Sequence, residues 1–428
     1  MKRNTTHEAA TPHAIVEDAW EAVGASFERF CLSAGIATLS AMMEQDVATL
    51  CGARHGREDG KVGHRWGRTR GPIGFHGGKV VVERPRVRAK GSKAELSLPS
   101  WSAAITEDWL GEWALNLMLI NVSTRRFGRA VRLPEGDIPA GAGAGVSKSA
   151  VSRRFVALSA ERMADWMAMD LSALDLLVIQ IDGLHLADDL TLVAAVGIYG
   201  EGTKHPLGVI EGATKNAAVV QALLDNLMGR GLDAGTPRLF IIDGAKALTR
   251  AIRRTFGRDT PIQRCQVHKS RNIVDRLPKS LLASVRKTLR QAWELDDAET
   301  AEKLLRNLAR RLEQIAPGVA GSILEGIDEI LTVTRLRLPP ELRRSLACTV
   351  TNIIENMMGS IRRTCRNVKR WRNTTMALRW TAAGMIEAAK GFRKLKAHNQ
   401  LPALRAALDA HKLSLVPNAD LAQPAKVA

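Results

Sequence analysis

The sequence predicts an α/β domain that is interrupted by an all-α segment and preceded by a mostly helical region. Three observations support this prediction. Apolar, strand-like segments at 176–182, 190–200 and 204–212 follow one another directly, and helices and strands then alternate. The hydrophobic spacing is helical throughout 279–337. It is also helical from residue 1 to about residue 52.

The order of the α/β elements is that of a ribonuclease-H-like core. The three strands, expected to be antiparallel, precede a helix in NAAVVQALLDNLMGRGL, a buried strand in RLFIIDG, a helix in AKALTRAIRRTFG and a short strand in PIQRCQVH. We assign 173–278 to the first part of this core and 279–340 to an all-α insertion. Residues 341–395 are then further core helices, and 396–428 are a C-terminal tail.

The composition indicates a polyanionic partner. The 428 residues include 62 Lys and Arg against 44 Asp and Glu, a net charge of +18. Arginine, whose planar guanidinium suits phosphate, dominates the basic clusters. Ribosomal, membrane-surface and merely basic proteins share this balance. The sequence contains no 18-residue apolar run, and its first residues lack the apolar region of a secretory signal. Five scattered cysteines argue against a disulfide framework. We therefore expect a cytoplasmic, nucleoid-associated protein without a membrane partner.

The N-terminal part, 1–105, combines helices with a basic β module. Between Arg54 and Lys93 basic residues and glycines are frequent, and GKVVVERPRVRA alternates like a strand that is broken by Pro85. This module is either a nucleic-acid contact surface or a solvated linker, and we favour contact.

Residues 106–172 contain two possible helix-turn-helix units. In ALNLMLINVSTRRFGRAV and AGAGVSKSAVSRRFVALSAERM a short turn leads to a helix capped by Ser123 or Ser147. Such a second helix can enter a DNA major groove, although two helical hairpins with basic exteriors would have the same pattern. The DNA-contacting candidates are Arg125, Arg126, Arg129, Lys148, Arg153 and Arg154.

Two carboxylates stand at matching strand ends. VIQIDG ends in Asp182 and FIIDG ends in Asp243, each followed by glycine. A single aspartate at such a position is usually a turn former or a helix cap. Two carboxylates at the carboxyl edges of neighbouring strands converge, however, and need a proton or a cation between them. Mg²⁺ or Mn²⁺ suits such oxygen ligands.

The segment CTVTNIIENMMGSIRRTCRNVKRW offers a third carboxylate. On a helical wheel Glu355 shares one face with Gly359, Arg362 and Arg366, while apolar residues occupy the other face. An exposed helix with spaced opposite charges would look the same. The combination of an acid, arginines and a glycine gap also suits a nucleic-acid strand that crosses the helix.

In order, the segments IDG, FIIDGAKAL, QRCQVHKSRNI followed by LPK, and TNIIENMMGSIRR resemble the signature of the mutator-type transposases of bacterial insertion sequences, a DDE family. The resemblance spans roughly 105–390. It implies a ribonuclease-H-like catalytic domain, two divalent metal ions and an N-terminal region for the element's terminal inverted repeats. By motif, the catalytic and metal-binding residues are Asp182, Asp243 and Glu355.

Cys265 and His268 match the family's C-x-x-H element. A zinc site would need two further ligands, and no second pair stands at a suitable spacing. We expect a packed cysteine beside a histidine that binds a phosphate oxygen or holds the active-site loop.

The expected function is that of a DNA transposase, acting on terminal repeats and target DNA as at least a dimer. Its metal ions activate water and then a DNA 3′-hydroxyl for attack on phosphodiesters. Two alternatives remain: a non-catalytic DNA-binding regulator or decayed element, and a ribonuclease-H-like nuclease that cuts without joining.

Overall fold

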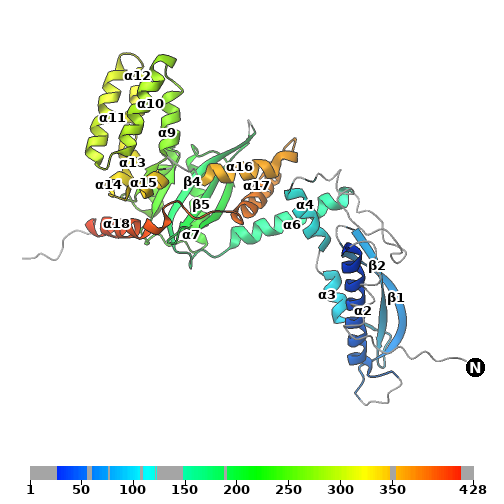
Figure 1. Cartoon of the computed structure of the whole chain (residues 1–428). Helices are drawn as coiled ribbons and strands as arrows, with labels where there is room; N and C mark the ends of the chain where they lie inside the picture. Colours follow the sequence, from blue (N-terminus) through cyan, green and yellow to red (C-terminus); the bar gives the residue numbers. More distant parts are fainter. Residues whose placement is uncertain are drawn as a thin grey trace, which may run out of the picture. The chain divides into compact units, whose positions relative to one another are not determined.

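The structure is a computed structural model of the chain, which divides into two compact units, 1–159 and 160–428 (Figure 1). The described residues are 27–54, 60–75, 78–106, 109–120, 122, 148–187, 190–347 and 353–415.

The first unit contains a small antiparallel sheet covered by helices. Strand β1 (Gly63–Phe75) pairs with β2 (Gly78–Ala89), and the short β3 (Glu95–Leu96) pairs with the other edge of β2. Helix α2 (Phe27–Cys51) packs on both long strands and on α3 (Pro99–Thr106). Apolar side chains of these elements form one core. The helix expected in the N-terminal part is therefore confirmed for the part of it that the structure describes.

The expectation that Pro85 breaks its strand is wrong. Strand β2 runs through Pro85, which is buried and pairs with Arg68 of β1. The register of β1 shifts between Arg65 and Arg68, and Gly67 there has a φ of +84°. This bulge interrupts the ladder beside the residue that has no N–H to donate, so the proline is tolerated.

Two further helices follow the small sheet, and the second of them crosses the boundary between the two units. Helix α4 (Trp109–Leu119) and helix α6 (Lys148–Ala168) meet through the fully buried Ala114 and Val151. The described part of helix α6 begins at Lys148, and Ser147, the predicted cap, lies outside the described residues. The segment 123–147, including the first candidate recognition helix, lies outside the described residues.

The second unit is built on a five-stranded sheet of order β6-β5-β4-β7-β8. The pairs β6/β5 and β5/β4 are antiparallel, whereas β4/β7 and β7/β8 are parallel. All five predicted strands are thus present, and the first three are antiparallel as expected. Their bounds are β4 Leu176–Ala187, β5 Leu190–Tyr199, β6 Lys204–Glu211, β7 Leu239–Ile242 and β8 Ile262–Arg264.

Helices α7 (Ala217–Gly229) and α8 (Lys246–Phe256) pack on this sheet. Alternate strand residues such as Ile179, Ile181 and Phe240 share a core with their apolar faces. Because side chains alternate along a strand, Asp182 points to the face opposite that of Ile181.

The helical segment after β8 has a hydrophobic core of its own. This result confirms the helices predicted for 279–337. The bounds are α9 Gln266–Val274, α10 Lys279–Glu294, α11 Ala298–Glu313, α12 Pro317–Leu324, α13 Ile327–Ile330, α14 Thr332–Arg335 and α15 Pro340–Leu346.

The chain then returns to the sheet. Helix α16 (Ile353–Thr364) lies against β4 and packs on α17 (Thr374–Ala389), which lies against β6. Residues Cys365–Asn367 form a 3-10 turn, η1, and His398–Gln400 form a second one, η2. The segment expected to be a tail contains helix α18 (Leu401–Ser414). Arg405 of this helix forms an ion pair with Asp175 at 2.6 Å.

Among the described segments, no helix has both the length and the apolar character needed to cross a membrane.

Candidate active site

The two aspartates singled out in the sequence lie at the same edge of the sheet. The last parallel pair of β4 and β7 joins Ile181 to Ile242, and Asp182 and Asp243 are the next residue of each chain segment. Strand β7 ends at Ile242 as predicted. Strand β4 does not end at Asp182, because its antiparallel pairing with β5 carries it on to Ala187. What ends beside Asp182 is the neighbouring strand β7.

Asp182 is a buried carboxylate with few partners. Its side chain is 7% exposed, and its Oδ1 accepts a hydrogen bond from the backbone N–H of Gly183 at 2.8 Å. Burial raises the pKa of Asp182 to about 7, and the negative charge of Asp243 adds to this increase while His268 opposes it. The site therefore binds positive charge, either a proton or a cation.

Asp243 is held by two hydrogen bonds. Its Oδ1 accepts from the backbone N–H of Ala245 at 2.8 Å, and its Oδ2 accepts from the hydroxyl of Thr214 at 2.9 Å. Thr214 is buried and lies in the connection between β6 and α7. A side chain at Gly183 would place its Cβ 3.5 Å from the methyl group of Thr214. Thr214 could not be identified from the sequence, because one threonine in a loop has no distinctive pattern.

Cys265 and His268 join the two aspartates at this edge. Cys265 is 2% exposed, immediately precedes α9 and donates its backbone N–H to the carbonyl of Ile242 at 2.8 Å. A hydrogen bond with Cys265 raises the pKa of His268 to about 9, and the charges of Asp182 and Asp243 act in the same direction. An imidazolium here partly balances the two carboxylates. Among the residues whose side chains are described, no three His, Cys, Asp or Glu form a metal-binding group.

Glu355 lies in α16, the helix that packs against β4, but its side chain is outside the described part of the structure. The predicted two-sided character of the helix is confirmed where it is described: Met357 and Ile361 are fully buried and Arg362 is exposed. The predicted position of Arg366 on the same helix is wrong. Helix α16 ends at Thr364, and Arg366 is exposed in η1, so the helical wheel does not apply to it.

The glycine that permits close helix packing is Gly384, which the sequence analysis did not identify. A Cβ at Gly384 would lie 3.3 Å from the backbone of Ile361, so α17 approaches α16 closely at this position. At Gly359 the nearest atom to a Cβ would be a guanidinium nitrogen of Arg363 at 3.7 Å. No described part of the protein approaches Gly359 closely, and the gap there stays open.

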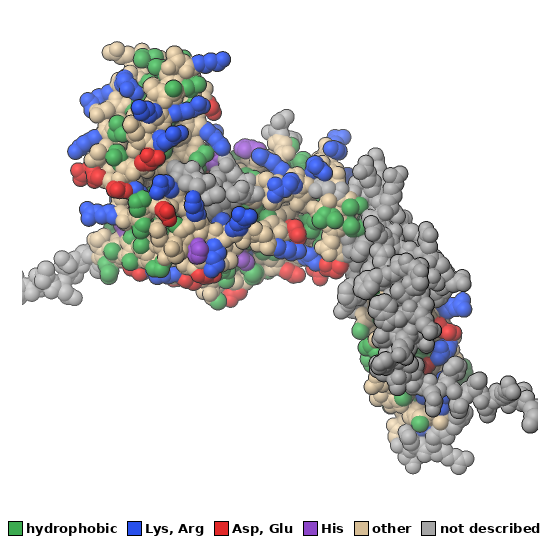
Figure 2. All heavy atoms as spheres, in the orientation of Figure 1, with side chains coloured by type: hydrophobic (Ala, Val, Ile, Leu, Met, Phe, Trp, Pro, Cys, Tyr) green, Lys and Arg blue, Asp and Glu red, His purple; other side chains and the backbone are tan. Residues whose placement is uncertain are grey.

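Exposed cations follow Glu355 along the chain. Among the described residues they form no ion pair or hydrogen bond through their side chains, in contrast to Arg363, which donates to Ser360 at 2.7 Å. Figure 2 shows Lys and Arg side chains on the face over α16. The exposed cations that follow Glu355 in the sequence are Arg362, Arg366, Lys369, Arg370 and Arg372.

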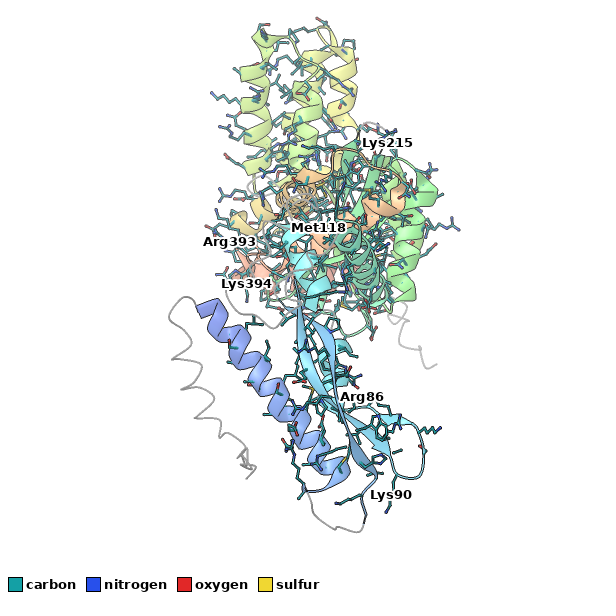
Figure 3. The ribbon with its side chains drawn as sticks, turned by 90° about the vertical axis from the view of Figure 1, so that its right-hand side faces the viewer. Arg86, Lys90, Met118, Lys215, Arg393 and Lys394 are labelled. Carbon is teal, nitrogen blue, oxygen red and sulfur yellow. The ribbon has the colours of Figure 1, made fainter. Side chains whose placement is uncertain are left out.

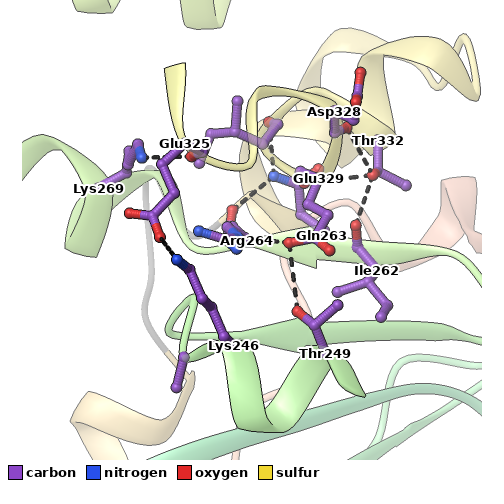
Figure 4. Close-up of polar contacts among 12 residues, drawn as sticks. Lys246, Thr249, Ile262, Gln263, Arg264, Lys269, Glu325, Asp328, Glu329 and Thr332 are labelled. Atoms are coloured by element: carbon purple, nitrogen blue, oxygen red, sulfur yellow. Dashed lines mark hydrogen bonds and ion pairs between the residues drawn. The ribbon is translucent and has the colours of Figure 1, made fainter. Parts of the chain in front are cut away.

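A buried ion pair joins the helical segment to the sheet beside Asp243 (Figure 4). Arg264, the last residue of β8, donates to Glu329 of α13 at 2.5 Å, and both side chains are 9% exposed. The guanidinium of Arg264 lies close to Gly326, since a Cβ at that position would be 2.4 Å from the guanidinium carbon. A Cβ at Gly244 would lie 3.3 Å from Cδ of Arg264. Neither glycine position has room for a side chain while Arg264 occupies this place.

A polar cavity of about 250 Å³ lies between Asp243 and the helical segment. Lys269 lines it and donates from Nζ to the carbonyl of Glu325 at 2.7 Å. Burial, with a smaller effect from Arg264, lowers the pKa of Lys269 to about 8. The remaining lining residues are Gly244, Arg264, Asn272, Arg276, Gly318, Ser322 and Glu325. The cavity therefore presents cations and amides next to the carboxylates, as a phosphate-binding site would.

The predicted DNA-binding residues of the first candidate helix, Arg125, Arg126 and Arg129, lie outside the described residues. Lys148 and Arg153 are exposed on α6, and Arg154 is half-buried.

The arginines of the basic β module are largely paired within the protein. Arg86 donates to Glu95 at 2.7 and 3.1 Å, and the guanidinium of Arg88 lies 3.7 Å from the ring centre of Trp66. Lys90, which follows β2 near Arg86 (Figure 3), is exposed. Much of the positive charge in this sheet therefore stabilises the unit itself.

Comparisons with known proteins agree with the motifs. The family model described as "Transposase, Mutator family" matches residues 28–394. The chain is 27% identical over 277 residues to the transposase for insertion sequence element IS6120 of Mycolicibacterium smegmatis, which covers 64% of this chain and 83% of that protein. It is 30% identical over 173 residues to the transposase for insertion sequence element IST2 of Acidithiobacillus ferrooxidans, which covers 40% of this chain and 56% of that protein.

Proposed function

The chain belongs to the mutator family of transposases, and from this premise we propose that it cleaves DNA at the ends of an insertion sequence and joins those ends to a target. Transposases act on DNA. The observation that carries the proposal is the meeting of Asp182 and Asp243 at one edge of the sheet, beside a helix that contains Glu355.

The proposed catalytic domain is a ribonuclease-H-like core with an all-α insertion. Support comes from the sheet order β6-β5-β4-β7-β8, with two antiparallel pairs followed by two parallel pairs. The separate core of the helices between β8 and α16 supports the insertion.

Asp182, Asp243 and Glu355 are the residues that would hold one or two Mg²⁺ or Mn²⁺ ions. The fit rests on the two convergent carboxylates, and it is supported by the pKa of Asp182, which burial raises and the charge of Asp243 raises further. When bound, a divalent ion activates the attacking oxygen and stabilises the leaving oxygen of a phosphodiester.

The other residues of the site orient the aspartates and balance negative charge. Thr214 and the backbone N–H of Ala245 orient the carboxylate of Asp243. The imidazolium of His268 faces both aspartates and can donate to a phosphate oxygen that enters the site. Lys269 and Arg276 line the adjoining cavity, where they can bind a neighbouring phosphate of the same strand.

The N-terminal region, up to about residue 172, is proposed to bind the terminal inverted repeats through Lys148, Arg153 and Arg154 of α6 and through Arg125, Arg126 and Arg129. Arg362 and Arg366 are proposed to contact the DNA backbone near the catalytic centre. Two ends must be brought together for joining, so at least a dimer is expected on DNA.

The test uses purified full-length protein and the DNA that flanks its gene. Matched inverted repeats in those flanks provide the substrate ends, and a plasmid provides the target. We expect cleavage and joined product with Mg²⁺ or Mn²⁺ and neither with EDTA. End binding should weaken steeply as salt rises, because Lys and Arg contacts release counterions. Cleavage without any joining would support a nuclease instead, and binding without cleavage would support a regulator.

A further inference from the structure

A second cavity, of about 460 Å³, lies among α9, α10 and α15. Gln266, Ser270 and Val274 of α9 line it at intervals of one helical turn. His268 is two residues from Gln266 and therefore lies on the opposite side of the helix from it. One short helix thus has the proposed catalytic site on one side and this cavity on another.

The interior of the cavity is apolar and contains an aromatic ring. Leu289 and Val274 are buried, and Val267 and Trp293 are half-buried. The indole N–H of Trp293 donates to the hydroxyl of Ser270 at 3.2 Å, which holds the ring in place. Flat apolar ligands stack on such a side chain.

Gln266 adds an unsatisfied polar group to this interior. It is 2% exposed, its Nε2 donates to the carbonyl of Ile330 at 3.4 Å, and its Oε1 has no hydrogen-bond partner among the described residues. A buried acceptor without a partner is destabilising.

Four exposed arginines surround the opening, together with Asp275 and Glu294. Two of them, Arg286 and Arg290, are one turn apart on α10 and have no side-chain partner within the described residues. The other two are Arg271 and Arg344.

We propose that this cavity binds a single unpaired nucleobase of the DNA, with the base on Trp293 and its flanking phosphates at Arg286 and Arg290. This proposal rests on the proposed function only in taking DNA as the ligand. The cavity volume falls within the range of small-ligand sites, and a base supplies a flat apolar face that can stack on Trp293. The polar cavity beside Asp243 lacks an aromatic ring and does not suit a base.

The test measures the binding of full-length protein, in EDTA, to two short duplexes that differ by one bulged 2-aminopurine. The wild type should bind the bulged duplex about tenfold more tightly than the paired one, since stacking of one base contributes about 1–3 kcal/mol. The fluorescence of the 2-aminopurine should be quenched on binding. Trp293→Ala should remove both effects, and Trp293→Phe should retain most of the preference.

Arg286→Ala tests the rim without disturbing the core, and Arg311→Ala, an exposed arginine of α11 that does not line the cavity, is its matched control. Arg286→Ala should reduce affinity for the bulged duplex more than Arg311→Ala does. Equal affinity of the wild type for both duplexes would overturn the proposal, as would a preference that survives Trp293→Ala in folded protein.

Binding of free dAMP distinguishes a nucleobase within DNA from the nucleobase of a free nucleotide. If dAMP binds in the cavity while the bulge gives no advantage, the ligand is a free nucleotide and the DNA proposal is wrong. These outcomes are independent of catalysis: a protein that neither cleaves nor joins can still prefer the bulge, and an active transposase can lack that preference.

Discussion

At the residue scale, Asp182 shows what a buried carboxylate costs the folded protein. A carboxylate that is 7% exposed and faces a second carboxylate is destabilising when ionised and unpaired. Its pKa is about 7 in the folded chain, compared with about 3.9 in an unfolded chain. The stability that the protonated form contributes is thus fully present below about pH 4 and is lost as the pH rises through about 7.

Asp182→Asn should therefore stabilise the protein in EDTA at pH 8, because it removes the buried charge and keeps the shape. The gain is at most about 4 kcal/mol, the free-energy equivalent of raising the pKa of Asp182 from about 3.9 to about 7. The gain should be smaller at pH 5. Thermal unfolding at both pH values measures it, with the exposed Asp259→Asn as a control that leaves the melting temperature unchanged. A melting temperature for Asp182→Asn at or below that of the wild type at pH 8 would contradict this explanation.

Arg362 is exposed on α16, the helix that contains Glu355, and we expect it to contact the DNA backbone. Arg362→Ala should lower joining by about tenfold, because a charge-assisted hydrogen bond to phosphate contributes about 1–3 kcal/mol. Arg362→Lys should rescue only part of this loss, since lysine lacks the planar fork. If Arg362→Ala instead lowers the melting temperature and leaves joining per folded molecule unchanged, the arginine supports the helix and not the DNA.

Sequence reasoning could find the aspartates because the same ending, IDG, occurs twice after apolar strands. It could not find Thr214 or Arg264, whose positions near Asp243 depend on how a loop and a neighbouring strand fold back. Arg366 was assigned to a helix that ends two residues earlier. Local patterns identify residues on regular elements, whereas partners supplied by loops depend on tertiary structure.

At the element scale, α16 and α17 show that a glycine can serve packing or leave open space. Gly384→Ala should destabilise the protein by about 1–3 kcal/mol, because its Cβ would press on Ile361. Gly359→Ala has room and should stabilise the helix by up to about 1 kcal/mol. If a DNA strand crosses the helix at Gly359, the same variant should join DNA more slowly although it melts at a higher temperature.

Denaturant unfolding and a joining assay on both glycine variants check this pair of expectations. If Gly359→Ala joins DNA as fast as the wild type, no DNA strand crosses α16 at this position. A stabilising Gly384→Ala would show that the two helices can separate at no cost.

The strands of the large sheet were predictable because they are apolar runs bounded by turn residues. The continuation of β4 past Asp182 and of β2 through Pro85 was not. Each depends on a neighbouring strand: β5 extends β4, and a bulge in β1 accommodates the proline. Strand limits set by pairing cannot be read from one strand alone.

At the scale of the whole molecule, the chain combines an N-terminal unit with a sheet domain into which helices are inserted. The helical block was recognisable from its periodicity, and the family from four ordered motifs. The junction between that block and the sheet was not recognisable, because the pairing of Arg264 with Glu329 joins residues 65 positions apart. This junction places the inserted helices beside Asp243 and next to the two cavities on α9.

The most direct measurement of the central claim is joining of the element's ends by three variants, Asp182→Asn, Asp243→Asn and Glu355→Gln, in the presence of Mg²⁺. Each replaces an ionised ligand by a neutral group of the same shape, so each should lose joining while binding the ends nearly as well as the wild type. Asp259→Asn, just before β8 at the other end of that strand from the site, should join normally. Ordinary joining by any of the three would contradict the role of that residue in the catalytic site.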